Sequence, residues 1–90
     1  LPVREITIAL LDRVEDARRI LGEIAGVTQV RDLPDEGGRK RLRVDFTGDD
    51  AALSALLQTL AQRGLPVVSF AEEMRDLESV FMRATRGIVS

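Results

Sequence analysis

The chain has 90 residues, of which 44% are hydrophobic and 31% charged, and its formal net charge is −2. This is the balance of a water-soluble globular domain, and the acidic excess argues against nucleic-acid binding, which needs a surplus of Lys and Arg. Because the chain contains no Cys and no His, disulfides, thiol nucleophiles, imidazole bases and the usual zinc ligands are excluded.

The first elements along the chain are a strand and a helix. Apolar and polar residues alternate over residues 5–10, which predicts a strand with Ile6, Ile8 and Leu10 on one face. Asp12 can then cap a helix that ends at Gly26. Its apolar positions recur at helical spacing: Val14, Ala17, Ile20, Leu21 and Ile24.

Two strands joined by a hairpin follow. Residues 27–33 predict a polar strand, and residues 34–38 (Pro-Asp-Glu-Gly-Gly) are typical of a hairpin connection. The returning strand, residues 39–47, alternates more cleanly. One of its faces carries Leu42, Val44 and Phe46, and the other carries Arg41, Arg43 and Asp45.

The second half of the chain predicts helix, strand and helix. Gly48-Asp49-Asp50 is predicted to start a helix that Gly64 stops. Its leucine stripe, expected to face the sheet, consists of Leu53, Leu56, Leu57 and Leu60. Residues 65–73 predict a fourth strand. A last helix begins at Asp76, which can cap it, and its apolar stripe consists of Leu77, Val80, Phe81, Ala84 and Ile88.

The order β-α-β-β-α-β plus a helix predicts a single α+β domain over residues 1–90. It is the ferredoxin-like arrangement, with a four-stranded antiparallel sheet and an added C-terminal helix. Strands 5–10 and 39–47 are expected in the centre of the sheet, and both helices on one face. The opposite, polar face would be lined by Glu5, Thr7, Arg41, Arg43 and Asp45.

No residues form a recognisable catalytic, cofactor or metal site, so we expect the isolated domain not to be an enzyme. There is no GxxxxGK[ST] loop for nucleotide phosphates, and the carboxylate pairs lack calcium-loop spacing. The basic cluster of Arg39, Lys40, Arg41 and Arg43 could hold an anion. A solvated sheet face explains it more simply, because Arg39, Arg41 and Arg43 share one face while Lys40 points the other way.

The fourth strand is the expected site of association. Strands 27–33 and 65–73 are the sheet edges in this arrangement, and an exposed edge invites pairing unless it is charged or covered. The strand around Ser69 carries no charge from Val67 until Glu72. We therefore expect Ser69 to lie at an interface with a second copy of the chain or with a parent protein.

The tail provides a family resemblance. Residues 67–87 contain Leu77-Glu78, Val80-Phe81 and Thr85, and are preceded by Gly64-Leu65-Pro66-Val67 after a leucine-rich helix. This resembles the ending of the domain that follows the ATPase core in many ABC-transporter ATP-binding subunits. Asp76 stands where that family has a capping serine, and it can still cap the helix.

The resemblance implies a non-catalytic accessory domain, regulatory or for dimerisation, cut from the C-terminus of a longer ABC ATPase subunit. Its start at Leu1 rather than Met fits a fragment. The implied partners are the parent ATPase domain, which would bind ATP and Mg²⁺, a second copy of the chain, and indirectly a membrane permease. The implied location is cytoplasmic, at the membrane through the transporter complex and without direct insertion, since no apolar run approaches roughly 18 residues.

Two alternatives stay open. Leu77, Val80 and Phe81 can dock the last helix on its own domain or contact a partner subunit. The domain can also be a free-standing ligand sensor of the same shape, binding a small molecule at a dimer interface, because this fold hosts unrelated functions.

Overall fold

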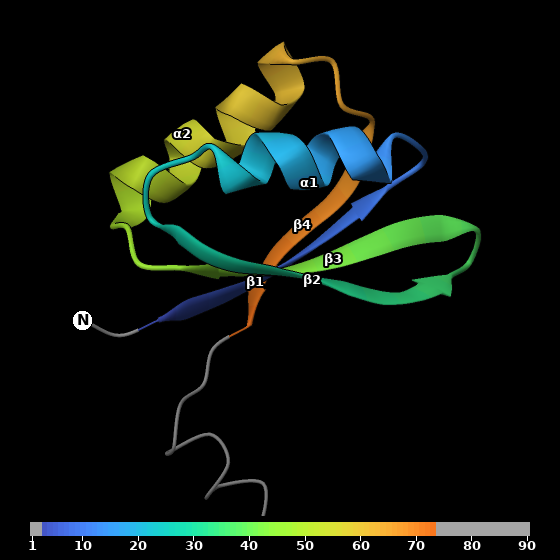
Figure 1. The fold of residues 1–90 in the computed structure, drawn as a ribbon, viewed down its shortest axis with the longest axis horizontal. Coiled ribbons are helices and arrows are strands. Elements are labelled where there is room, and N and C mark those ends of the chain that lie inside the picture. The colour runs from blue at the N-terminus through green and yellow to red at the C-terminus, as the bar shows by residue number, and fades with distance from the viewer. Residues whose placement is uncertain (1–2, 74–90) are drawn as a thin grey trace, which may run out of the picture.

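The computed structural model describes residues 3–73, which form an α+β domain (Figure 1). In chain order its elements are β1 (Arg4–Leu10), α1 (Val14–Gly22), β2 (Val27–Glu36), β3 (Arg39–Phe46), α2 (Asp50–Gln62) and β4 (Val67–Glu73). The predicted class and antiparallel sheet are confirmed, in a form compatible with a small ferredoxin-like fold. The last helix, predicted from Asp76, lies outside the described residues.

The four strands form one antiparallel sheet in the order β2-β3-β1-β4. β1 and β3 are therefore central, and β2 and β4 are the edges. In β1 and β3, Ile8 pairs with Leu42 and Thr7 with Arg43. Because paired residues share a sheet face, this register separates an apolar face from a polar one.

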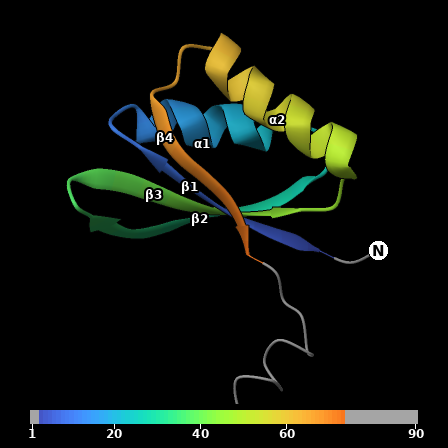
Figure 2. The ribbon, with the colours of Figure 1, turned by 180° about the vertical axis from the view of Figure 1, so that it is seen from behind.

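Both helices cover the same face of the sheet (Figures 1 and 2). α1 packs against β2 and β3, and α2 packs against β4. The predicted apolar faces of the two central strands are confirmed, because all six of their residues are fully buried: Ile6, Ile8, Leu10, Leu42, Val44 and Phe46. Neither helix within residues 3–73 is long and apolar enough to cross a bilayer.

Phe46 is enclosed by the backbone on two sides. A methyl group added at Gly48 would lie 2.5 Å from the Phe46 ring, and one added at Gly26 would lie 2.9 Å from it. The N–H of Thr47 donates to the Gly26 carbonyl at 3.0 Å, which holds the two segments together. These glycines let the chain pass close to the ring of Phe46, which is fully buried.

The hairpin between β2 and β3 is tighter than the predicted turn over residues 34–38. Glu36 pairs with Arg39, and the turn consists of Gly37 and Gly38 alone, both with positive φ. A two-residue hairpin turn favours such backbone angles, and glycine adopts them without strain. Pro34 lies inside β2, where an edge strand tolerates a residue without an N–H.

The ends of α1 differ from the predictions, whereas α2 starts within the predicted Gly48-Asp49-Asp50 segment and stops before Gly64. Asp12 does not cap α1 as predicted: its carboxylate accepts from the N–H of Arg13, and Arg13 occupies the cap position with φ 63° and no side-chain cap bond. α1 ends at Gly22 rather than Gly26. The Asp49 carboxylate caps α2 by accepting from the N–H of Ala52 at 2.9 Å.

The leucine stripe of α2 faces the sheet only in part. Leu56 and Leu60 are buried, and Leu53 packs against the core at its margin. Leu57, however, is 38% exposed. The prediction that all four leucines face the sheet is therefore wrong for Leu57, because α2 covers the edge of the sheet with one narrow stripe.

Candidate functional site

The sheet face opposite the helices is the surface on which polar side chains gather. Its central residues are Glu5, Thr7 and Ala9 of β1 with Arg41, Arg43 and Asp45 of β3, which pair across the two strands. The predicted polar face is thus confirmed by the register. In Figures 1 and 2 neither helix reaches this side of the sheet.

Arg43 ties three strands together on this open face. Its Nη1 donates to Glu5 Oε2 at 3.2 Å and its Nη2 to Glu73 Oε1 at 3.1 Å. Its Nε donates to Thr7 Oγ1 at 3.2 Å. Glu5 is only 7% exposed, so the guanidinium compensates a carboxylate that burial would otherwise disfavour. Arg43 therefore stabilises the sheet, and each of its three side-chain nitrogens already donates a hydrogen bond.

The other predicted basic residues have different surroundings. Arg41 lies 3.1 Å from Glu36, and Lys40 lies 2.8 Å from Asp35. Lys40 pairs with Leu10, which places it on the helix side and confirms the predicted division of the cluster between two faces. Arg39 lies within 4.0 Å of no carboxylate among residues 3–73.

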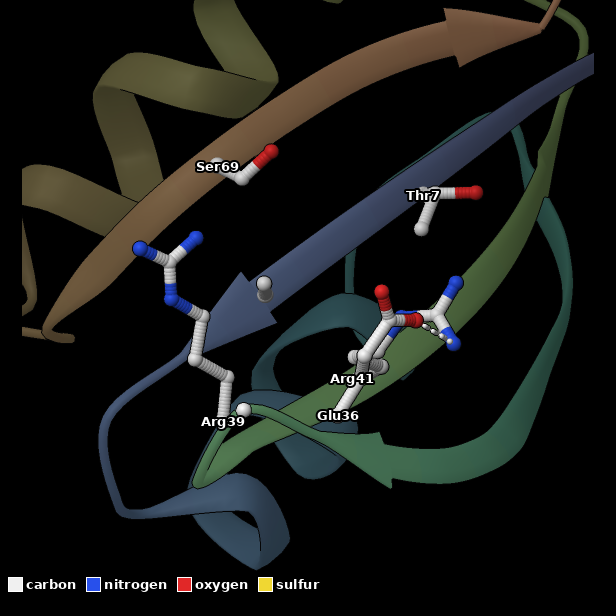
Figure 3. Close-up of a pocket in the computed structure, with 7 residues that line it drawn as sticks. Thr7, Glu36, Arg39, Arg41 and Ser69 are labelled. Atoms are coloured by element: carbon white, nitrogen blue, oxygen red, sulfur yellow. Dashed lines mark ion pairs between the residues drawn. The ribbon is translucent and has the colours of Figure 1, made fainter.

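Next to Arg39 the open face contains a depression of about 390 Å³ (Figure 3). It is lined by Thr7, Ala9, Glu36, Gly37, Arg39, Arg41 and Ser69. Ala9 pairs with Arg41 on one side and Ser69 on the other, so the smallest side chain of the row lies between two larger polar ones. In Figure 3, Arg39 and Ser69 lie on one side of the hollow, and Arg41, Glu36 and Thr7 on the other.

A second cluster of charged residues, Arg4, Asp50 and Glu72, lies on the helix side of the sheet. Arg4 donates to both carboxylate oxygens of Glu72 at 2.8 Å, and to Asp50 Oδ1 at 2.8 Å. Its Nη1 also donates to the Gly48 carbonyl at 3.2 Å. These hydrogen bonds lower the pKa of Glu72 below its usual range and raise the pKa of Arg4. One side chain of β1 thus holds the end of β4 and the start of α2.

Of the predicted docking residues, only Ser69 lies within the described part of the chain. It is exposed on the edge strand β4 and borders the depression. Leu77, Val80, Phe81 and the predicted cap Asp76 lie outside the described residues, so their roles stay predictions.

Sequence reasoning missed two arrangements. The Arg4–Glu72 pair joins residues that are 68 positions apart, and the depression joins Ala9, Arg39 and Ser69 from three strands. The only signal for the second was the small Ala9 in the polar row of the first strand. Recognising it requires the pairing register, which alternation alone does not supply.

Residues 3–73 contain no group of three or more Asp and Glu side chains placed to hold a metal ion. No protein-family model matches the chain, and no curated protein sequence matches it. Among residues 3–73, the open face, the outer edge of β4 and the depression beside Arg39 are therefore the features that bear on function.

Proposed function

We propose that this chain is a non-catalytic accessory domain, ferredoxin-like in arrangement, of the ATP-binding subunit of an ABC transporter, and that it associates through β4. One observation carries the proposal. β4 leads directly into the tail that resembles the ending of that family, and it is a sheet edge with no charged residue from Val67 to Ala71.

The two edges of the sheet differ in how well they suit a partner. β2 carries Arg31, Asp32, Asp35 and Glu36, and charged side chains discourage edge pairing. β4 lacks such residues in its first part, and Val68 at its irregular start is 40% exposed. The neighbouring helix α2 adds Leu57, which is 38% exposed. Among residues 3–73 the outer edge of β4 pairs with no strand, and this edge together with the exposed apolar side chains favours β4 for contact with a second copy or with the parent ATPase domain.

In this proposal the chemistry belongs to the parent protein. Its ATPase domain binds ATP and Mg²⁺, and the accessory domain assists dimerisation or regulates hydrolysis. Leu77, Val80 and Phe81 would dock the last helix on the domain or on a partner, with Asp76 as its cap. The permease is reached only through the assembled complex, at the cytoplasmic side of the membrane.

The sharpest test is the coding sequence upstream of Leu1. A GxxxxGK[ST] loop and an ABC signature in the same reading frame would support the proposal. A start codon directly before Leu1 would exclude a parent ATPase in the same chain.

A second test addresses the absence of catalysis. Calorimetric titration of residues 1–90 with ATP and Mg²⁺ should show no heat of binding, because we find no phosphate-cradling loop in the sequence. Micromolar binding would contradict the non-catalytic assignment.

The depression beside Arg39 favours one second candidate, a free-standing sensor for a small molecule. Small-molecule sites are concave and carry a few convergent polar groups, as this hollow does. A start codon before Leu1 together with saturable binding of a small molecule would favour the sensor over the transporter domain.

A further inference from the structure

We propose that the depression lined by Arg39 and Ser69 is a binding site for a small organic carboxylate that carries hydroxyl groups. The guanidinium of Arg39 would hold the carboxylate, and Ser69 would hydrogen-bond the rest of the molecule. The proposal concerns the ligand chemistry of this surface and does not depend on whether the domain belongs to a transporter.

The first argument is that the guanidinium of Arg39 forms no ion pair with another described residue. Most Lys and Arg side chains of residues 3–73 have a carboxylate within 4.0 Å, and the two exceptions are Arg39 and Arg63. Of these two, only Arg39 lines the depression. An anion bound there gains a cation without breaking an existing ion pair.

The second argument is the pattern of hydrogen bonds around the hollow. Thr7 Oγ1 accepts from Arg43, and Arg41 contacts Glu36 and the Pro34 carbonyl. Within the described chain, the side chains of Arg39 and Ser69 have no hydrogen-bond partner. Both lie on the same side of the hollow in Figure 3, so one ligand can contact both.

The third argument is the space that Ala9 leaves. Ala9 lies in a central strand between Arg41 and Ser69, and a longer side chain would fill the hollow. The volume of about 390 Å³ lies in the range of about 300–1,000 Å³ that small-molecule pockets occupy. A molecule larger than a bare inorganic anion therefore fits best.

The net charge of the residues that line the hollow favours a carboxylate over a phosphate monoester. Two guanidinium groups and one carboxylate give the hollow a net charge of +1. A carboxylate supplies the matching single negative charge, whereas a phosphate monoester carries about −1.5 to −2 at neutral pH and would exceed it. The polar lining, with two hydroxyl groups, favours a ligand that also carries hydroxyls.

The test is a titration of the ¹⁵N-labelled chain with sodium gluconate, a hydroxylated carboxylate, followed by NMR. Ionic strength is held constant with NaCl, and parallel titrations use NaCl alone and inorganic phosphate. We expect saturable shifts of the Gly37, Arg39 and Ser69 amides with gluconate, at millimolar affinity because the site is open to solvent. Shifts that do not saturate, shifts reproduced by NaCl, or tighter binding of phosphate would each overturn the proposal.

Matched variants show whether Arg39 and the hollow are responsible. Arg39→Gln should weaken gluconate binding about fivefold, in line with an exposed ion pair, while Arg63→Gln removes the same charge elsewhere and should leave binding unchanged. Ala9→Val keeps every charge and should also weaken binding by occupying the hollow. Equal loss in Arg39→Gln and Arg63→Gln would reveal a nonspecific charge effect and sink the site. Unchanged binding in Ala9→Val, with a native circular dichroism spectrum, would place the ligand outside the hollow.

Discussion

Gly48 shows how strongly one residue of this small domain is constrained by its neighbours. A Cβ at this position would lie 2.5 Å from the Phe46 ring and 2.7 Å from Ala52 Cβ. Phe46 is fully buried and cannot move away without disturbing the core between β3 and the helices. A single methyl group must therefore displace either the ring or the start of α2.

We expect Gly48→Ala to lower the free energy of unfolding by about 1–3 kcal/mol, the usual cost of overpacking a core. Gly22→Ala is the matched control, because a Cβ at Gly22 meets nothing within 4 Å and Ala suits a helix better than Gly. Urea denaturation of both variants measures the difference. Equal stability of Gly48→Ala and wild type would show that the ring has room to move.

The Arg4–Glu72 pair predicts a specific response to acid. Hydrogen bonds from Arg4 lower the pKa of Glu72 in the folded chain, so the unfolded chain binds the proton more readily. The pair therefore stabilises the fold above the ordinary glutamate pKa of about 4.3, and this contribution is lost as the pH falls through the lowered value. Stability should rise with pH in that interval.

Glu72→Gln tests this effect, since glutamine resembles a protonated glutamate. We expect the variant to unfold at lower urea concentration than wild type at pH 7, and the difference to vanish in strong acid. Glu23→Gln is the control, because its contact with Arg19 is long at 3.9 Å and solvent-exposed. A difference between Glu72→Gln and wild type that persists unchanged below the lowered pKa would show that the ion pair is not its cause.

At the scale of elements, the start of α2 is set by one side chain. Asp49 accepts from the N–H of Ala52 and satisfies a backbone group that the first turn leaves free. We expect Asp49→Ala to destabilise the domain by about 0.5–2 kcal/mol, and Asp49→Ser to retain most of the stability because serine also caps helices. Thermal unfolding compares the variants. If Asp49→Ser is as unstable as Asp49→Ala, the loss comes from charge rather than capping.

The strands were more predictable than the helix ends. Alternation in residues 5–10 and 39–47 identified the buried faces of β1 and β3, because a two-residue period fixes the face of every side chain. α1 ends at Gly22 rather than at Gly26. Both glycines suit a chain reversal in the sequence, but only Gly26 has a positive φ, of 95°, and packs against Phe46. Asp12 likewise precedes a helix, yet the chain turns at Arg13 before the helix begins.

For the candidate site, the sequence predicted which residues share a sheet face but not which of them contact one another. The sequence indicates that Glu5, Thr7, Arg41 and Arg43 share a surface, which the register confirms. It cannot indicate that Glu36 contacts Arg41 and leaves Arg39 without a carboxylate partner among residues 3–73, because that choice depends on the two-residue turn. The Arg4–Glu72 contact depends in turn on how β1 and β4 align.

At the scale of the whole described domain, residues 3–73, both helices lie on one side of the sheet and neither covers the other side. Cross-strand ion pairs stabilise that open side: Arg43 with Glu5 and Glu73, and Arg31 with Asp45. Because these side chains already pair with one another, few of them can form ion pairs with a partner that packs on this sheet face. The outer edge of β4, which pairs with no strand among residues 3–73, is therefore the better surface for association.

We predict that the chain forms a homodimer through antiparallel pairing of two β4 strands. Ala71→Lys places a charge on this exposed edge, outside the depression beside Arg39, and should weaken the dimer without unfolding the monomer. Gln29→Lys adds the same charge to the other edge, β2, and should leave the dimer intact. Analytical ultracentrifugation over a range of concentrations measures all three proteins. A wild type that stays monomeric at high concentration would exclude the homodimer, and equal weakening by both variants would move the interface away from β4.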